Sequence, residues 1–343
     1  MPRTPPPRPT AWQTRRARAI VRWYLDAYHG TPWDMGVAST FMDPSRVGHF
    51  AVNREAFEAG DPAALFKILV ATAMFQKRSD QQILRVLRGI GEADAQELSS
   101  APWLLAQARG SACPALESTD TLREQCDLAK DQQRRGTCGR SPGAACHLKR
   151  HTELLKRYGH FGKVPTSIAL AVAEAGVNDL AELRARVLQD AAEPTEAAVM
   201  LQSALCKAWR VSEKISAMFL SLVCTPDLCP SVVPPWAEGV DWTQFVVVDS
   251  NVDLFLRATG YPGPWTYEAR RMFLRTLARR VDLAAMKPGL RRFNPRLVQQ
   301  ALYLFMSASN RRVSRGDCSS GGAAACRACR VELRKVCAWG FLK

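Results

Sequence analysis

Long apolar segments are missing from this sequence of 343 residues. No run approaches the roughly 20 apolar residues that a helix needs to cross a bilayer, which argues against an integral membrane protein. The N-terminus, MPRTPPPRPT, has no apolar core of the kind found in secretory signal peptides. We therefore expect a cytoplasmic protein whose eleven cysteines are thiols or metal ligands and not disulfides.

The sequence also lacks a strong bias in its amino-acid composition. Hydrophobic residues make up 47% of the chain and charged residues 23%, which excludes a disordered tail, a collagen and a disulfide-stapled miniprotein. A chain of this length holds one large hydrophobic core or two ordinary ones. Two domains are the expectation.

Acidic residues are scarce at both ends of the chain. Residues 1–22 contain six arginines and no acid, and residues 250–343 contain 18 Lys or Arg against five acids. The remaining residues, 23–249, carry a net charge of −4 out of a total of +15. This uneven distribution favours a polyanionic partner, with nucleic acid ahead of an anionic membrane surface. The alternative interpretation is that the positive charges form a solvent-exposed basic surface that binds no partner.

Strand signals are few, and helical spacing of apolar residues recurs along the chain. Asp61-Pro62 predicts the start of a helix through ALFKILVATAMFQ, with Asp61 as its N-cap. The other predicted helices cover 15–28, 79–91, 148–158, a segment after Pro165, 178–190, 194–209, 251–259, 266–283 and 295–309. Residues 1–14 are expected to form a flexible basic arm, and residues 111–147 an insertion or loop. The predicted fold class is all-α.

Three segments of the sequence, taken in their order along the chain, are informative about function. They are LFKILVATAMFQKRSD (65–80), RVSEKISAMFLSLV (210–223) and FVVVDSNVDLFLRATGY (245–261). Together with HFGKVPTSIALAV (160–172), they resemble the helix-hairpin-helix DNA glycosylases of the endonuclease III type. The resemblance covers roughly residues 60–340, except for the insertion at 111–147. It places Lys214 on the catalytic lysine of that family and Asp249 on its catalytic aspartate.

The resemblance implies two helical domains with a DNA-binding cleft between them. Residues 62–245 would form a helical-barrel domain that carries the hairpin and the insertion. Residues 15–61 together with 246–343 would form the second domain, with a metal-cluster loop at its C-terminus. The implied partner is double-stranded DNA containing a damaged base or an abasic site, bound by a monomer associated with the nucleoid.

The resemblance also implies DNA contacts. Gln76, Lys77 and Arg78 stand where the family inserts a polar wedge into the gap left by the flipped base. Arg210 and Ser212 stand where the family hairpin has glycines that approach a DNA phosphate. The cations expected to surround the C-terminal cluster and to meet phosphates include Arg311, Arg312, Arg315, Arg327 and Arg330.

A lysine and an aspartate are the minimum set for this chemistry. A carboxylate stabilises the cationic sugar that forms when an N-glycosidic bond breaks. A neutral lysine attacks C1′ and forms a Schiff base, which then loses its 3′ phosphate by β-elimination. Burial of Lys214 against Ile215, Met218 and Phe219 would favour the neutral amine. An ordinary surface lysine and an ordinary helix N-cap are the alternative interpretations of Lys214 and Asp249.

The cysteines form two groups. Cys318, Cys326, Cys329 and Cys337 lie within 20 residues and include a Cys-x2-Cys pair, which predicts a metal site. The family favours a 4Fe–4S cluster there, and zinc is the alternative. Cys113, Cys126, Cys138 and Cys146 form the second group, with His147 or His151 as substitutes for a second metal. Cys206, Cys224 and Cys229 are expected to be core or loop thiols.

These observations leave three functions open. The first is a base-excision repair glycosylase with lyase activity. The second is a metal-stabilised DNA-binding protein of the same fold without catalysis, which the missing hairpin glycines allow. The third is a zinc-binding regulatory protein that binds nucleic acid. The identity of the damaged base does not follow from the sequence.

Overall fold

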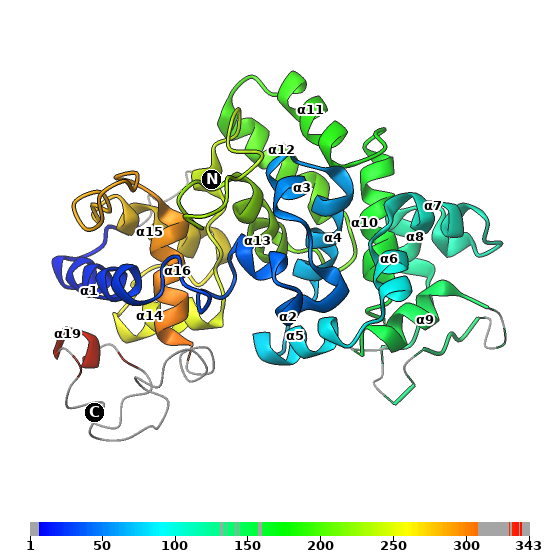
Figure 1. The fold of residues 1–343 in the computed structure, drawn as a ribbon, viewed down its shortest axis with the longest axis horizontal. Helices are drawn as coiled ribbons and strands as arrows, with labels where there is room; N and C mark the ends of the chain where they lie inside the picture. Colours follow the sequence, from blue (N-terminus) through cyan, green and yellow to red (C-terminus); the bar gives the residue numbers. More distant parts are fainter. Residues whose placement is uncertain are drawn as a thin grey trace. The chain divides into compact units, whose positions relative to one another are not determined.

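Helices make up the regular structure of this protein (Figure 1). The computed structural model describes residues 7–130, 133–134, 136–140, 143, 145–156, 160–307, 329, 331–335 and 337. Within them no strand forms, and an isolated antiparallel bridge pairs Leu128 with Cys138. The prediction of an all-α fold is confirmed. None of the described helices combines the length and the hydropathy that a bilayer crossing requires.

The chain divides into two compact units. Unit 1 comprises Met1–Thr40, Thr225–Val233 and Thr243–Lys343, and unit 2 comprises Phe41–Cys224 and Pro234–Trp242. The segment 225–244, which has little helical periodicity in the sequence, is thus shared between the two units.

Unit 2 is built around helix α4 (Pro62–Ala73), nearly all of whose side chains from Ala64 onward are buried. A helix that is apolar on every side must be covered on every side. The packing bears this out, because α4 contacts α3, α6, α10, α11 and α13. The helices of unit 2 are α2 (Pro44–Val47), α3 (Arg54–Glu58), α4, α5 (Asp80–Arg88), α6 (Glu92–Ser99), α7 (Ala101–Arg109), α8 (Thr119–Gln125), α9 (His147–Leu154), α10 (Lys163–Glu174), α11 (Leu180–Asp190), α12 (Pro194–Cys206) and α13 (Glu213–Cys224).

The predicted start of α4 is confirmed, since the Asp61 carboxylate accepts a hydrogen bond of 2.7 Å from the backbone N–H of Ala64. The next helix, α5, begins after Ser79, which forms a capping box with Gln82. It ends at Arg88, immediately before Gly89, as the glycine predicted.

Three stretches of unit 2 differ from the sequence expectation. Residues 111–147 are not wholly a loop, because α8 begins within them at a capping box formed by Ser118 and Thr121. Helices α6 and α7 were not predicted. They are short and meet at Ser100, which ends one helix and caps the next. Helix α12 ends at Cys206 and not at residue 209, because the chain turns there toward α13.

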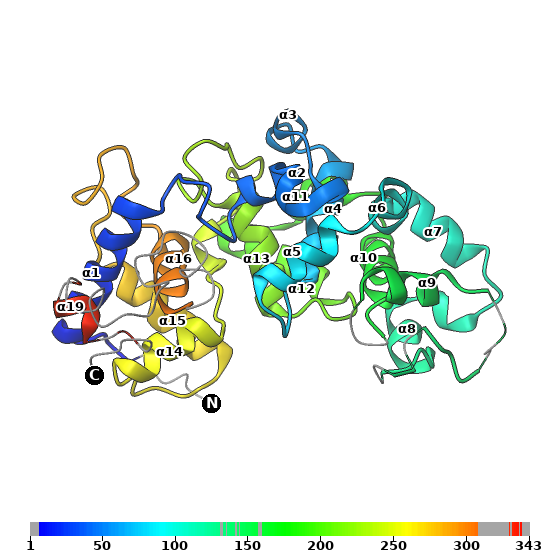
Figure 2. The same ribbon diagram turned by 60° about the horizontal axis from the view of Figure 1, so that its bottom comes forward.

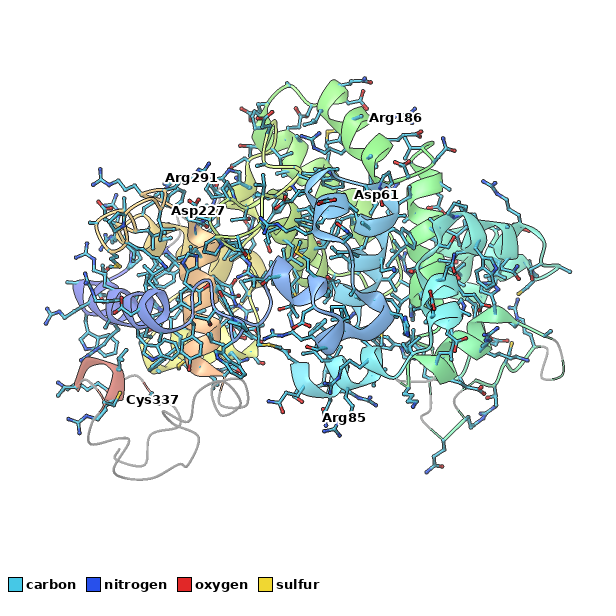
Figure 3. All side chains as sticks on the ribbon, in the orientation of Figure 1. Asp61, Arg85, Arg186, Asp227, Arg291 and Cys337 are labelled. Carbon is cyan, nitrogen blue, oxygen red and sulfur yellow. The ribbon has the colours of Figure 1, made fainter. Side chains whose placement is uncertain are left out.

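Unit 1 is built around helix α16 (Pro295–Met306), which is also buried on nearly all sides. It packs against α1 (Ala11–Ala27), α14 (Ser250–Ala258) and α15 (Tyr267–Ala278), and α1 also contacts the short helix α19 (Val331–Arg334). Figure 2 shows α1 alongside α16. The segment 225–233 is fastened to this unit by an ion pair of 2.8 Å between Arg291 and Asp227 (Figure 3) and by Asn294, whose amide donates to the Pro226 carbonyl.

The predicted flexible arm is too long by four residues. Residues 11–14 belong to α1, because Thr10 and Gln13 cap each other's backbone N–H groups in a capping box. Gln13 also donates to the Thr259 carbonyl at 2.9 Å, which attaches the start of α1 to the end of α14. Tertiary contacts of this kind order a segment whose composition alone indicates flexibility.

Candidate functional site

At the position of the predicted helix-hairpin-helix, helices α12 and α13 are joined by a six-residue turn, and we call these two helices with their turn the α12–α13 hairpin. The turn closes through a 3.1 Å bond from the Val211 N–H to the Ala208 carbonyl, and α13 opens with a 2.9 Å bond from Ser216 N–H to Ser212 carbonyl. Arg210 has a φ of +65°, in the left-handed region that favours glycine. Arg210 therefore adopts the backbone conformation for which the resembled family uses a glycine.

Lys214 is the second residue of α13 and is half-buried. Ile215 and Phe219 are fully buried beside it, whereas Met218 is half-buried, so the apolar surroundings expected for Lys214 are only partly formed. Within the described part of its unit, the Lys214 amine has no hydrogen-bond or ion-pair partner. The amine is thus available to a ligand.

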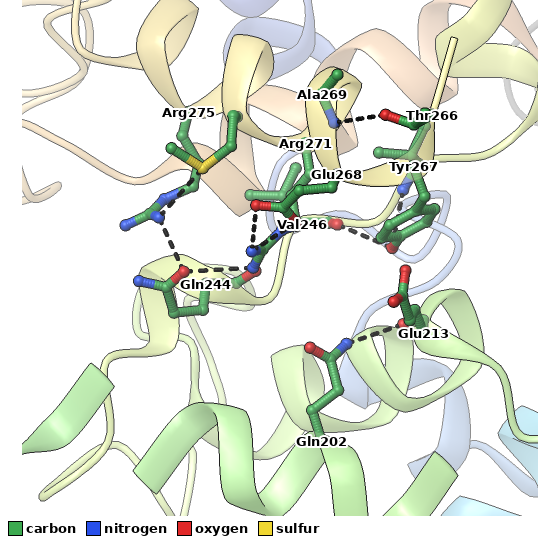
Figure 4. Close-up of polar contacts among 12 residues, drawn as sticks. Gln202, Glu213, Gln244, Val246, Thr266, Tyr267, Glu268, Ala269, Arg271 and Arg275 are labelled. Atoms are coloured by element: carbon green, nitrogen blue, oxygen red, sulfur yellow. Dashed lines mark hydrogen bonds and ion pairs between the residues drawn. The ribbon is translucent and has the colours of Figure 1, made fainter. Parts of the chain in front are cut away.

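The turn before Lys214 is fixed by side chains of its own hairpin. Gln202 of α12 donates to the Glu213 carbonyl at 3.1 Å (Figure 4). The Ser216 hydroxyl lies 3.1 Å from the carbonyl oxygens of both Ser212 and Glu213. These contacts hold the first turn of α13 and hence the direction in which Lys214 leaves it.

The predicted wedge residues follow the end of α4. Gln76 donates from Nε2 to the Ala73 carbonyl at 2.7 Å and to the Arg210 carbonyl at 3.0 Å. The structure thus brings this turn against the turn between α12 and α13. Lys77, with a φ of +54°, and Arg78 are both exposed.

Asp249 lies at the N-cap of α14, where its carboxylate accepts a 2.9 Å hydrogen bond from the Val252 N–H. The buried segment that leads to it is held by Tyr267, whose hydroxyl donates to the Val246 carbonyl at 3.1 Å and accepts from the Val248 N–H (Figure 4). The carboxylate is half-buried, so it keeps access to solvent while its backbone is fixed.

A buried cation lies within electrostatic range of Asp249. Burial lowers the pKa of Arg296, whereas the charges of Tyr24, Asp34 and Asp249 raise it. Arg296 donates to Gln300 at 2.8 Å, and Gln300 in turn donates to Asp34 at 2.9 Å. This network inside unit 1 gives Asp249 a fixed positive neighbour.

Several arginines of the basic C-terminal region have partners within the protein. Arg271 and Arg275 both bond Gln244, at 3.0 Å to its carbonyl oxygen and 2.8 Å to its side-chain oxygen (Figure 4). Arg270 forms a 2.5 Å ion pair with Asp253. Arg271 and Arg275 thus position the segment before Asp249 and Arg270 holds the first turn of α14 after it, roles that the charge count alone did not reveal. Arg257 is exposed, and its guanidinium lies 4.3 Å from the ring centre of Trp265.

Of the four cysteines predicted to bind a metal near the C-terminus, the structure describes Cys329 and Cys337. Cys318 and Cys326 lie outside the described residues, as do Arg311, Arg312, Arg315, Arg327 and Arg330. Cys329 and Cys337 lie on either side of α19, and both half-buried thiols pack against the hydrophobic core of unit 1. Two of the four predicted ligands thus flank one short helix and lie against this core.

In the insertion, Cys126 and Cys146 pack against one apolar cluster that includes Leu122 and Leu148. Burial raises the pKa of the Cys126 thiol, and the nearby thiols of Cys146 and Cys138 raise it further. Cys113 is exposed. Among the described residues, no three Cys, His, Asp or Glu side chains are grouped closely enough to hold a metal ion.

Of the two histidines considered as substitute ligands, His151 is buried and His147 is half-buried. His147 pairs through Nε2 with the Thr166 hydroxyl at 3.0 Å. Neither ring nitrogen of His151 has a hydrogen-bond partner among the described residues. Burial lowers the pKa of His147 to about 4 and that of His151 to about 3, so both rings are neutral at physiological pH.

A cavity of about 740 Å³ in unit 2 lies elsewhere, between the starts of α4, α7 and α11. Its lining includes Lys67 and Glu92 but neither Lys214 nor the hairpin. It does not coincide with the candidate site. No family model, curated protein or solved structure matches this chain.

Proposed function

We propose that the protein is a base-excision DNA glycosylase with lyase activity, in which Lys214 is the nucleophile and Asp249 the electrostatic stabiliser. The observation that carries the proposal is the α12–α13 hairpin, with Arg210 in a glycine-like conformation and Lys214 two residues into a helix whose first turn is fixed. In this proposal unit 1 contributes Asp249 and unit 2 contributes Lys214.

The reaction begins with a base extruded from the duplex, because neither side chain reaches C1′ inside the stack. The glycosidic C1′–N bond breaks, its electrons leave with the base, and the base takes up a proton. Asp249 opposes the positive charge that develops on the sugar, which lowers the barrier because that charge is absent from the ground state. The deprotonated Lys214 amine forms the new C1′–N bond.

The lyase step follows from that bond. Opening of the sugar ring gives a Schiff base between C1′ and Lys214, which acidifies the C2′ hydrogens. Loss of a C2′ proton and cleavage of the C3′–O bond release the 3′ phosphate by β-elimination. Hydrolysis of the Schiff base then returns the lysine.

The same proposal includes the metal. Cys318, Cys326, Cys329 and Cys337 would hold a 4Fe–4S cluster, with zinc as the alternative, in a structural role. Four thiolates suit either, and visible absorption with elemental analysis separates them. The same elemental analysis, on a chain with Cys329 replaced by serine, shows whether Cys126, Cys138 and Cys146 bind a second ion.

The test is borohydride trapping on a duplex with one abasic site. Wild-type protein should form a covalent adduct and Lys214→Ala should form none, because only a Schiff base is reduced. Lys207→Ala is the matched control: it removes an exposed lysine from the same hairpin and should trap normally. Equal trapping by Lys214→Ala would exclude this lysine, and absence of trapping by wild-type protein would favour a DNA-binding protein without lyase chemistry. A panel of duplexes, each with one lesion, identifies the base.

A further inference from the structure

The guanidinium of Arg210 is held by a single imidazole nitrogen. Its Nε and Nη2 lie 3.1 Å and 2.6 Å from Nε2 of His160, fifty residues earlier in the chain. Arginine only donates, so Nε2 of His160 must accept and the ring proton must be on Nδ1. That Nδ1 is buried and has no hydrogen-bond partner among the described residues. His160 is 4% exposed, so the ring is fixed by its surroundings.

The imidazole remains an acceptor at physiological pH. Burial, together with the positive charges of Arg210, Lys163 and Lys77, lowers the pKa of His160 to about 4. Protonation would place a donor against the guanidinium, and this does not occur near neutrality. The contact between His160 and Arg210 is therefore constant over the pH range in which DNA is bound.

Trp209 supports both partners of this contact. Its ring meets His160 edge to face, with centroids 5.6 Å apart, and the Arg210 guanidinium carbon lies 5.7 Å from the ring centre. Trp209 is itself anchored by a 2.9 Å bond from its backbone N–H to the Ser167 hydroxyl. Lys163, on the same ring at 4.7 Å, donates to two backbone carbonyls. The guanidinium is thus oriented and does not move freely in solvent.

The arrangement concentrates positive charge. The charged side chains with the largest effect on His160 are all cations: Arg210, Lys163, Lys130 and Lys77. Grouping like charges has an electrostatic cost, and a bound anion relieves that cost. Arg210 is half-buried, and within the described part of its unit its Nη1 has no hydrogen-bond partner. Two donor hydrogens therefore remain for a ligand at the hairpin.

We propose that His160 is a positioning residue that aims Arg210 at a phosphate of the DNA backbone. The guanidinium supplies by charge and by its planar fork the contact that a glycine hairpin makes through backbone N–H groups. The inference rests on the proposed function for the identity of the anion. It does not depend on the chemistry at Lys214.

The experiment measures binding of full-length protein to a duplex with an uncleavable abasic analogue, over a range of salt concentrations. His160→Leu should bind about tenfold more weakly at low salt, and its slope of log K against log salt should be shallower by about 0.9, the value for one phosphate contact. His160→Gln, which keeps an acceptor, should recover most of the affinity. Arg210→Ala should match His160→Leu, and the double variant should lose no more than either alone.

Arg54→Ala is the charge control, because it removes an exposed arginine paired with Glu58 in the same unit. It should leave the slope unchanged. A weaker His160→Leu with an unaltered slope, or a double variant with additive losses, would show that His160 acts only on folding and would overturn the proposal. Thermal melting excludes unfolded protein. If the slopes behave as expected while borohydride trapping fails, the phosphate site stands and the glycosylase assignment does not.

Discussion

The left-handed conformation of Arg210 leads to a quantitative prediction about stability. A residue with a side chain loses about 1–2 kcal/mol in this conformation, and glycine does not. Glycine loses part of that advantage, about 0.4–1 kcal/mol, because its unfolded chain is more flexible. Arg210→Gly and Arg210→Ala both remove the contact with His160 and one positive charge, so those effects cancel when the two variants are compared. We expect Arg210→Gly to be more stable than Arg210→Ala by about 1 kcal/mol.

Calorimetry resolves a difference of this size. For a unit of 150–250 residues, 1 kcal/mol corresponds to a shift in Tm of about 2–4 °C. The same pair of substitutions at Lys207 is the control, and its expected sign is opposite. Lys207 is exposed and has an ordinary helical φ of −65°. There glycine should be less stable than alanine by about 0.5–1 kcal/mol. If Arg210→Gly melts at or below the temperature of Arg210→Ala, Arg210 does not occupy the left-handed region and the hairpin geometry is wrong.

Three further predictions follow from single residues. Gly162→Ala should prevent unit 2 from folding, because the added Cβ would lie 2.0 Å from the Leu148 carbonyl oxygen, whereas Gly143→Ala meets nothing within 4 Å and should express normally. His151 has a folded pKa of about 3 against 6.5 in the unfolded chain, so the unfolded state binds its proton first. Stability should fall by up to about 1.4 kcal/mol per pH unit as pH drops below 6.5 toward 3, and His151→Phe should remove that part of the slope in urea titrations. Asp249→Asn should lower kcat of base excision by at least tenfold and change the Kd for DNA less than threefold; equal losses would make it only a helix cap.

The sequence predicted those features that depend on local chemistry. The capped starts of α4 and α5 follow from Asp61 and Ser79, each with the required partner within a few residues. Asp249 at the start of α14 follows from the same rule. Helix α8 was missed because it is seven residues long and lies among cysteines, glycines and arginines, where apolar periodicity is too short to detect.

Contacts between distant residues could not be predicted from the pattern. His160 and Arg210 are fifty residues apart, and no spacing rule pairs a histidine with a hairpin arginine. Nor does composition reveal that Arg271 and Arg275 bond Gln244, since net charge counts every arginine alike. The net charge of the sequence therefore indicated a polyanionic partner. Only the structure distinguishes arginines that form hydrogen bonds within the protein from arginines whose guanidinium groups are exposed to solvent.

The position of Gln76 decides which residue of its turn can enter DNA. Both hydrogens of its amide nitrogen are used, one on the Ala73 carbonyl and one on the Arg210 carbonyl. Insertion of Gln76 into a base stack would break both bonds, each worth about 0.5–1.5 kcal/mol, and would release the carbonyl of a residue held at positive φ. Lys77 and Arg78 follow immediately and are exposed, so insertion of either into a duplex would leave these two bonds of Gln76 intact. Under the proposed function we therefore expect Lys77 or Arg78 to be the wedge, while Gln76 holds the turn that carries Arg210.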